Sequence, residues 1–111
     1  MFDYIKGDIT DLKPTAVVIE TGQIGFLLNV SLNTYAKIEG QANAKLYIHE
    51  VIREDSFTLY GFAEKEERDA FLLLISVSGV GANTARTILS SFSVEELCAF
   101  ISSGNVNQLK G

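Results

Sequence analysis

The fold of the second half of this chain is decided by the stretch Val77-Ser78-Gly79-Val80-Gly81-Ala82-Asn83-Thr84-Ala85. Helical patterns of apolar residues flank it on both sides. Its glycines, Gly79 and Gly81, let the backbone turn tightly and approach another molecule, because no Cβ stands in the way. The next helix begins with free N–H groups that can donate to an anion such as a phosphate. The stretch therefore predicts a helix-hairpin-helix, a motif suited to gripping a nucleic-acid backbone without reading bases.

Length and composition indicate one domain or two small ones with a real core. The chain has 111 residues, of which 47% are hydrophobic and 21% charged, with a single proline, and this argues against disorder. No apolar run approaches the roughly 20 residues of a membrane span, and the N-terminus shows no secretory signal. The one cysteine, Cys98, excludes an internal disulfide. We therefore expect a cytoplasmic protein with no membrane partner.

The charge balance is a difficulty for a nucleic-acid-binding function. The formal net charge is −5, whereas attraction to phosphates supplies most non-specific affinity and basic domains are the usual signature. Around the hairpin, however, Arg86 is the only charged residue between positions 70 and 92. The positive charge near the hairpin therefore favours phosphate binding there, while the net negative charge argues against tight binding by an isolated chain.

The first 62 residues have the pattern of strands, with a tight turn at Gly22-Gln23 and room for one short helix between residues 31 and 43. In the strand expected near residue 48, Leu46, Ile48 and Ile52 alternate with polar neighbours. With no crossover helices, this pattern predicts a small closed antiparallel barrel. The expected strands cover residues 2–9, 15–21, 24–30, 44–53 and 57–62.

From Ala63 onward the pattern is helical. Acidic side chains complement the dipole at the first helix start, and the next two helices carry apolar residues at helical spacing. Ser93 and Glu96 match a capping box, and Gly104 would end the last helix. Leu72 and Leu73 fall outside the apolar face, which favours an oligomer, although further C-terminal helices would cover the same surface. The acidic residues at the first helix start are Glu64, Glu66 and Glu67. The expected apolar residues are Phe71, Leu74 and Ile75 in the first helix, Ala85, Ile88, Leu89 and Phe92 in the second, and Val94, Leu97, Cys98 and Ile101 in the third.

A barrel followed by a helix-hairpin-helix is a specific order, and one block of residues is distinctive. The block Arg53-Glu54-Asp55-Ser56-Phe57-Thr58-Leu59-Tyr60-Gly61-Phe62, an acidic helix start and Gly79-Val80-Gly81 resemble the RuvA family. These are the Holliday-junction-binding subunits of the bacterial RuvAB branch-migration complex. Tyr4-Ile5-Lys6-Gly7 and Glu20-Thr21-Gly22-Gln23-Ile24-Gly25 are also similar, so the resemblance covers the whole chain.

The resemblance implies an α+β protein, with a five-stranded OB-like β-barrel over residues 1–62 and an all-α helix-hairpin-helix domain over residues 63–111. The chain would stop before a second hairpin and a RuvB-binding domain. The implied partners are four-way junction DNA, further copies of the chain as a homotetramer or octamer, the RuvB motor and the RuvC resolvase. The subunit would be non-catalytic and without a cofactor, because RuvB uses the ATP; it would act in bacterial recombination, DNA repair and the SOS response.

The resemblance also assigns DNA-binding residues around the hairpin. Gly79 and Gly81 would offer backbone amides to phosphate oxygens, although an ordinary interhelical turn also uses glycines. Relatives commonly carry a lysine where this chain has Asn83, which can donate to phosphate or cap the helix but has no charge. One lost phosphate–cation contact flattens the salt dependence by about 0.9 log units per decade. Arg86, expected on the exposed side of the same helix, would approach the backbone.

In the barrel, Glu54 and Asp55 match the family's acidic pin. Carboxylates near a four-fold axis would repel phosphates and keep strands apart at the crossover; the ordinary alternative is a solvated turn. Arg53, just before them, is the barrel cation expected to contact DNA, or else a plain surface residue. A metal-dependent nuclease would need a third acidic ligand, and none is apparent nearby. We therefore expect no catalytic residues and no metal.

Other residues carry less information. His49 is the only histidine and has no Cys or His partners for zinc, so we expect a structural role. Cys98 is expected to be a buried small hydrophobe, and the role of Lys110 is open. No Gly-Lys-Ser/Thr sequence occurs, so there is no phosphate-binding loop for ATP.

Two other classes of function fit parts of the pattern. A helix-hairpin-helix glycosylase or nuclease would need a catalytic Lys or Asp shortly after the hairpin, and no matching pair occurs. In an architectural module, the barrel and the hairpin would both bind protein. Salt separates the last case, because binding to phosphates weakens steeply between about 50 and 200 mM salt.

Overall fold

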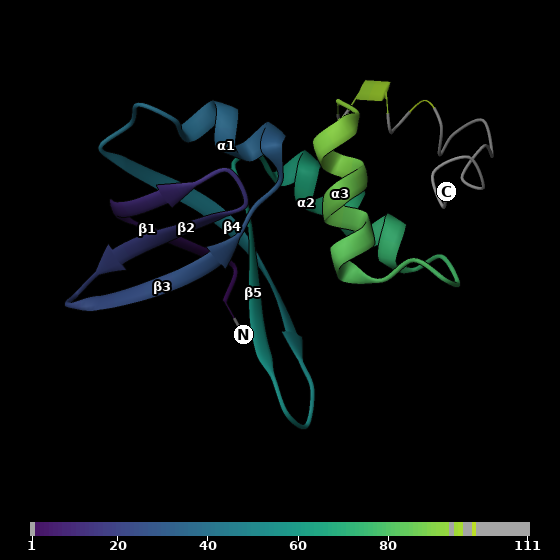
Figure 1. Cartoon of the computed structure of the whole chain (residues 1–111), viewed down its shortest axis with the longest axis horizontal. Helices are drawn as coiled ribbons and strands as arrows, with labels where there is room; N and C mark the ends of the chain where they lie inside the picture. Colours follow the sequence, from purple (N-terminus) through teal and green to yellow (C-terminus); the bar gives the residue numbers. More distant parts are fainter. Residues whose placement is uncertain (1, 94, 97–98, 100–111) are drawn as a thin grey trace.

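A computed structural model describes residues 2–93, 95, 96 and 99 of the chain. Strands come first, and the helical hairpin packs beside them (Figure 1). In chain order the elements are β1 (Tyr4–Lys13), β2 (Ala16–Thr21), β3 (Ile24–Asn29), α1 (Leu32–Ile38), β4 (Asn43–Ile52), β5 (Phe57–Phe62), α2 (Lys65–Ile75) and α3 (Ala82–Ser91).

The strands form a closed barrel in the order β1-β2-β3-β5-β4. Neighbouring strands are antiparallel except β3 and β5, which pair in parallel at Asn29 and Tyr60 and close the barrel. Residues that point inward at every second position fill it with apolar side chains. The expected five-stranded OB-like barrel and the α+β class are therefore confirmed. The barrel core consists of Ile5, Val17, Ile19, Leu28, Val30, Ile38, Leu46, Ile48 and Leu59.

Strand β1 is longer than the sequence pattern indicates. We expected it to end at Ile9, but it continues to Lys13. The first half pairs with β4 and the second half with β2, and the register shifts between Ile9 and Asp11. Asp8 and Asp11 weaken the local strand signal, so pairing partners far along the chain extend this strand rather than its own propensity.

The expected turn at Gly22-Gln23 is confirmed. Thr21 pairs with Ile24 across a two-residue loop, and φ is +56° at Gly22 and +70° at Gln23. Two positive φ values are the requirement of the turn type whose twist matches a two-stranded hairpin. This turn sets the register of β2 against β3.

The helices share a second core with the end of the barrel. Of the expected apolar residues of the helices, Phe71, Leu74, Ala85, Ile88 and Leu89 are buried, whereas Ile75 and Phe92 are only partly buried against the same core. The buried residues meet Tyr60 and Phe62 of β5, so this core begins inside the last strand. Leu72 and Leu73 are 38% and 52% exposed, in keeping with their position outside the apolar face. The buried helical residues are Ala70, Phe71, Leu74, Val80, Ala85, Ile88 and Leu89.

After α3 the chain enters the expected capping box. The N–H of Ser93 donates to Glu96 Oε1, and the N–H of Glu96 donates to Ser93 Oγ, both at 3.1 Å. The expectations for Val94, Leu97, Cys98, Ile101, Gly104 and Lys110 fall outside the described residues. No helix in the described ranges is long and apolar enough to cross a membrane.

Candidate nucleic-acid interface

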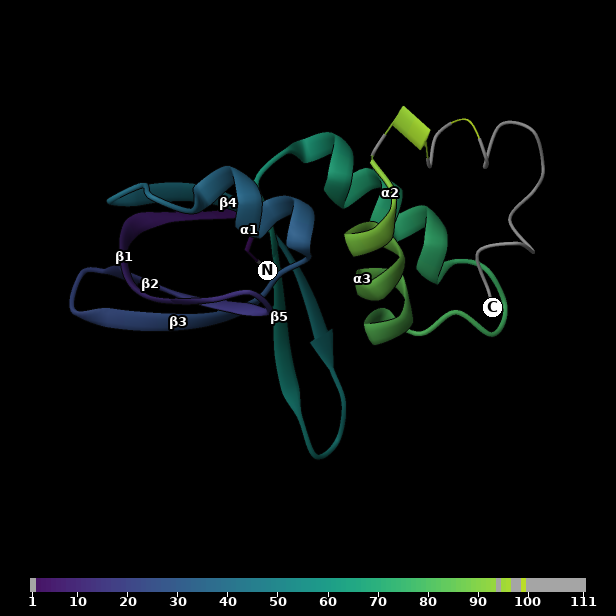
Figure 2. The same cartoon turned by 45° about the horizontal axis from the view of Figure 1, so that its top comes forward.

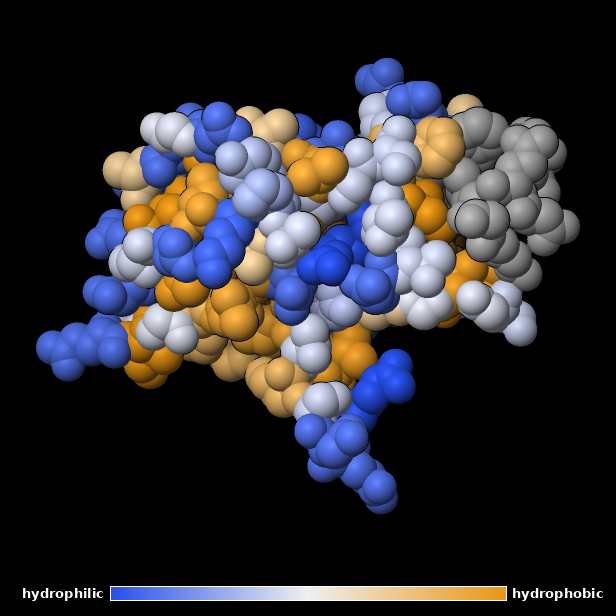
Figure 3. Space-filling view, viewed as in Figure 1, coloured by the Kyte–Doolittle hydropathy of each residue, from blue (hydrophilic) through white to orange (hydrophobic). Residues whose placement is uncertain are grey.

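The acidic pair lies at the tip of a protruding hairpin. Ile52 pairs with Phe57, and the N–H of Arg53 donates to the carbonyl oxygen of Ser56 at 2.8 Å, so the turn spans residues 53–56. The ends of β4 and β5 extend beyond the barrel as a two-stranded arm (Figures 1 and 2). Its tip is hydrophilic in the space-filling view (Figure 3). Glu54 and Asp55 are exposed there, where they can contact an external molecule.

The protruding arm also explains why one apolar expectation is wrong. Leu46 and Ile48 are buried as predicted, but Ile52 on the same face of β4 is 67% exposed. The alternation is correct, yet at Ile52 the strand has already left the barrel, so no core remains for this side chain to enter. Phe57, its partner on β5, is likewise 56% exposed.

Gly79 is required by the backbone of the hairpin. Helix α2 ends at Ile75, and the N–H of Val80 donates to the carbonyl oxygen of Val77 at 3.1 Å. Between them Gly79 has φ = +87°, a region that L side chains rarely adopt. Val80 is buried and anchors the loop in the helical core. At Gly79 the turn alone accounts for the glycine.

Gly81 is different, because nothing in the described part of the chain requires a glycine there. Its φ of −85° and ψ of 171° are ordinary extended values, and an added Cβ would meet nothing within 4 Å. It is the N-cap of α3, with no side chain to accept from the first-turn amides. Those N–H groups therefore face an open surface with the dipole of α3 behind them, an arrangement suited to an anion.

The expectation that Arg86 lies on the exposed side of α3 is wrong. The residue is half-buried, and its Nη1 donates to the carbonyl oxygen of Thr15 and to Asn29 Oδ1, both at 3.3 Å. Its Nη2 donates to Asn83 Oδ1 at 2.6 Å. Helix α3 turns this face toward the barrel, which sequence periodicity cannot reveal. Both ion pairs found among the described residues involve other side chains, so Arg86 keeps an uncompensated charge beside Asn83.

One groove brings the arm and the hairpin together. Residues 49–53 of the β4 arm line one side of it, and Ile75, Val80, Gly81 and Ala82 line the other. Arg53 and Gly81, which are 28 positions apart in sequence, therefore face the same hollow. Arg53 is exposed. A backbone lying in this groove would meet the Arg53 cation and the N-terminus of α3, and it would also pass the acidic Glu50.

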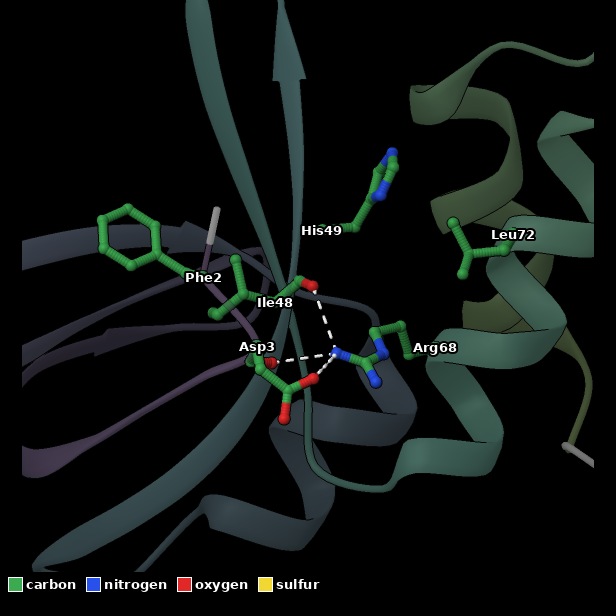
Figure 4. Close-up of a pocket in the computed structure, with 6 residues that line it drawn as sticks. All are labelled: Phe2, Asp3, Ile48, His49, Arg68 and Leu72. Atoms are coloured by element: carbon green, nitrogen blue, oxygen red, sulfur yellow. Dashed lines mark hydrogen bonds and ion pairs between the residues drawn. The ribbon is translucent and has the colours of Figure 1, made fainter.

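His49 lies between the two halves, as a packing residue. Its ring is 5.5 Å from that of Phe71, and burial lowers the pKa of His49 below its ordinary 6.5, with Glu50 acting in the opposite direction and Arg68 in the same one. Figure 4 shows this side chain near Leu72, and Arg68 reaching across to Asp3. Among the described residues, no group of three or more His, Cys, Asp or Glu side chains could hold a metal ion.

The sequence reading missed Arg68 and Asp3. Arg68 Nη1 donates to the backbone oxygen and to Oδ1 of Asp3, each at 2.9 Å, and to the carbonyl oxygen of Ile48 at 3.5 Å. This hydrogen bond lowers the pKa of the Asp3 carboxyl. The contact joins α2 to the residue before β1 and to β4. No local pattern marks it, because its members are 65 and 20 residues apart.

Glu67 was also misread. We expected a first-turn carboxylate that complements the helix dipole, and the residue does occupy that turn. It is only 1% exposed, however, and accepts hydrogen bonds from Ser31 Oγ and Thr34 Oγ1. The network joins α2 to α1 of the barrel. The only sequence signal for this network is the pair of hydroxyl residues Ser31 and Thr34, three positions apart at the start of α1.

Comparison with known proteins identifies the family. The model described as the RuvA N terminal domain matches residues 1–61. This chain belongs to the RuvA family. The match covers the barrel and the protruding arm, including Arg53, Glu54 and Asp55, and it ends one residue before the expected domain boundary at residue 62.

Similarity to individual RuvA proteins extends into the helices. The chain is 56% identical over 110 residues to a protein of Bacteroides fragilis, with 99% of this chain and 55% of that protein covered. It is 57% identical over 105 residues to one of Parabacteroides distasonis, with 95% and 54% covered. Both relatives are named Holliday junction branch migration complex subunit RuvA. The chain spans about half the length of these relatives.

Proposed function

We propose that this chain binds four-way junction DNA without sequence preference, as the junction-binding subunit of a branch-migration complex in recombination and DNA repair. The open N-terminus of α3 at Gly81 carries this proposal. It faces the same groove as Arg53, beside an arm tipped by Glu54 and Asp55. The relatives' names support the choice of a Holliday junction over other DNA.

Each part has a physical role in the proposed complex. The first-turn amides of α3 donate to phosphate oxygens of a duplex arm, and such contacts position DNA without reading its sequence. Gly79 shapes the loop, Asn83 offers its side-chain amide nitrogen, and Arg53 and Arg86 add positive charge. The carboxylates at the tip repel the phosphates of the strands that part at the crossover.

The net charge of −5 points to binding by several copies. A single chain of this charge gains little from phosphate attraction. In a homotetramer, four α3 termini and four arms hold the junction together, and linked weak sites bind far more tightly than one. The exposed Leu72 and Leu73 on α2 offer apolar surface for a neighbouring copy. An octamer would enclose the DNA from both sides.

The remaining parts of the proposal concern partners and place. We assign residues 1–62 to an OB-like domain and residues 63–111 to a helix-hairpin-helix domain, with no catalytic residues and no cofactor of their own. The motor RuvB, which would bind a region outside this chain, supplies ATP hydrolysis, and RuvC resolves the junction. The complex acts on chromosomal DNA in the bacterial cytoplasm.

The proposal is tested by titrating a synthetic four-way junction and a linear duplex of matched sequence with the chain in low salt. We expect gel shifts of the junction at lower protein concentration than the duplex. The titration is repeated at about 50 and 200 mM salt, because phosphate-driven binding weakens steeply over this range whereas an apolar protein interface changes little.

A second arm uses a longer chain with the length of the relatives. If this 111-residue chain shows no preference but the longer chain does, the groove needs a second hairpin and the assignment to junction binding stands. If neither prefers the junction, the proposed function is wrong. Release of bases from damaged duplex would instead favour a repair enzyme.

A further inference from the structure

Three polar side chains at the start of α1 join the barrel to the helical hairpin. Ser31, Asn33 and Thr34 belong to the barrel half of the sequence, yet each contacts α2 or α3. We call these three residues the α1 seam. Between the barrel and the hairpin, the seam supplies directional contacts, which fix an orientation more strictly than apolar packing does.

Asn33 caps the far end of α3. Its Nδ2 donates to the carbonyl oxygens of Leu89 and Phe92, the latter at 2.7 Å. The last carbonyls of a helix have no partner inside the helix, so this side chain provides one from another element. Ser90 Oγ in turn accepts from the N–H of Leu32 at 3.0 Å, at the start of α1. The start of α1 and the end of α3 therefore provide hydrogen-bond partners for each other's backbone groups.

Ser31 and Thr34 hold α2 through Glu67. Ser31 Oγ donates to Glu67 Oε2 at 2.8 Å, and Thr34 Oγ1 donates to Oε1. The N–H of Ala63 donates to Thr34 Oγ1 at 3.1 Å, which fixes the chain where it enters the helices. All three side chains are buried, with Ser31 and Thr34 at 0% exposure and Glu67 at 1%. A buried carboxylate that lost its donors would carry a large penalty, so this geometry resists displacement.

The seam therefore determines where the opposite end of α3 points. Helix α3 has 10 residues and is about 15 Å long. Asn33 holds its C-terminal end, and Arg86 ties its middle to Thr15 and Asn29. The N-terminus at Gly81 projects from these fixed points into the groove beside the β4–β5 arm. Any rotation of α3 about the barrel would change the distance from Gly81 to the tip.

We propose that the α1 seam positions the helix-hairpin-helix relative to the acidic tip, and that this fixed geometry gives the preference for a four-way junction over a linear duplex. A duplex needs only one groove, whereas a junction must meet the tip and the α3 terminus together. The inference rests on the proposed function. It assigns to Ser31, Asn33 and Thr34 a positioning role, since none of them lines the groove.

The test uses Thr34→Val, which removes the hydroxyl at nearly constant volume, and Thr34→Ser, which keeps it. Asn33→Ala is an independent second variant. Spin labels at Asp55→Cys and Ser78→Cys, both exposed positions, report the distance from tip to hairpin loop in a Cys98→Ala background. We expect one narrow distance distribution in the parent and in Thr34→Ser, and a broadened or shifted one in Thr34→Val and Asn33→Ala.

The same variants are then titrated with junction and duplex. We expect Thr34→Val and Asn33→Ala to lose about tenfold in preference for the junction, because simultaneous engagement depends on geometry, and to bind duplex as the parent does. Val17→Ala in the barrel core is the control for lost stability alone. It should lower the Tm and leave both the distance and the preference unchanged.

Three results would overturn the inference. Unchanged label distances in both seam variants would show that other contacts orient α3. Altered distances with full junction preference would show that the geometry does not matter for recognition. An equal loss of preference in Val17→Ala would reduce the effect to stability. If neither the parent nor the longer chain prefers the junction, the proposed function fails, and the distances still decide whether the seam positions the hairpin.

Discussion

Arg86 Nη2 donates a 2.6 Å hydrogen bond to Oδ1 of Asn83, three residues earlier on α3. The bond turns the carbonyl of the Asn83 amide toward the guanidinium, so the amide nitrogen is the group left to donate outward. A neutral side chain at the hairpin thereby acquires a positive neighbour. Arg86 and Asn83 together offer a cation and an amide donor, whereas we expected relatives to carry a single lysine at the position of Asn83.

Replacement of Arg86 separates its two roles. We expect Arg86→Ala to lower the Tm, because Thr15 and Asn29 lose a donor, and to flatten the plot of log affinity against log salt by about 0.9 if it removes one phosphate contact. Arg86→Lys should keep the salt slope but lower the Tm to a smaller extent, since lysine lacks the planar guanidinium that donates to several acceptors at once. A slope unchanged in Arg86→Ala would make the residue purely structural.

Restoring a lysine at the hairpin should have the reverse effect. Asn83 is exposed in the first turn of α3, so Asn83→Lys adds a charge without disturbing the core, and it removes the oxygen that accepts from Arg86 Nη2. We expect tighter junction binding and a salt slope steeper by about 0.9 log units per decade. Thr87→Lys, one turn further along the exposed side of α3, is the matched control. An equal gain from Thr87→Lys would show that only net charge matters.

The two hairpin glycines should respond in opposite ways. Gly79→Ala forces an L side chain into φ = +87°, so we expect a loss of about 1–2 kcal/mol in the free energy of unfolding. Gly81→Ser supplies an N-cap oxygen and should raise that free energy by a few tenths of a kcal/mol. Urea unfolding measures both.

Gly81→Ser should nevertheless weaken junction binding, because the serine oxygen occupies an amide that otherwise donates to phosphate. Gel-shift titration measures the effect. Binding that is unchanged in a more stable Gly81→Ser protein would contradict the role given to the α3 terminus.

Neutralising the tip tests the repulsion assigned to it. Glu54→Gln with Asp55→Asn alters only exposed side chains of a turn, so the Tm should stay within the small range typical of surface changes. Junction binding should be unchanged or tighter, because the tip no longer carries the negative charges proposed to repel phosphates. A large loss of junction affinity would show that the carboxylates attract a partner instead of separating strands.

His49 predicts a dependence of stability on pH. Burial lowers its pKa below 6.5 in the folded chain, so the unfolded chain binds more protons as the pH falls below that value. The contribution of His49 to the free energy of unfolding should therefore be fully present above about pH 7. It should decline as the pH falls through 6.5 toward the pKa of His49 in the folded chain. Asp3, whose pKa is lowered from 3.8, loses its contribution only at more acidic pH.

Urea unfolding at about pH 7.5, 6.5 and 5.5 measures this decline. His49→Phe keeps a ring against Phe71 and removes the titration, so its stability should vary less over the same range. Equal slopes in the two proteins would assign the pH dependence to other groups.

The sequence by itself determined the elements and their order. Alternating apolar residues gave the strands, Gly22-Gln23 gave a turn with two positive φ values, and Gly79-Val80-Gly81 gave the break between α2 and α3. These features depend on residues close together in the chain, so local steric and hydrophobic preferences suffice to specify them. The same local pattern carried the family resemblance.

The tertiary structure alone decided how the two halves meet. The extension of β1 to Lys13, the turn of Arg86 toward the barrel, and the burial of Glu67 under Ser31 and Thr34 all depend on partners far along the chain. Sequence periodicity shows which face of a helix is apolar, but it cannot show which polar side chain a distant element will receive. A polar group is buried only where the complete fold supplies its hydrogen-bond partners, because burial without them is too costly.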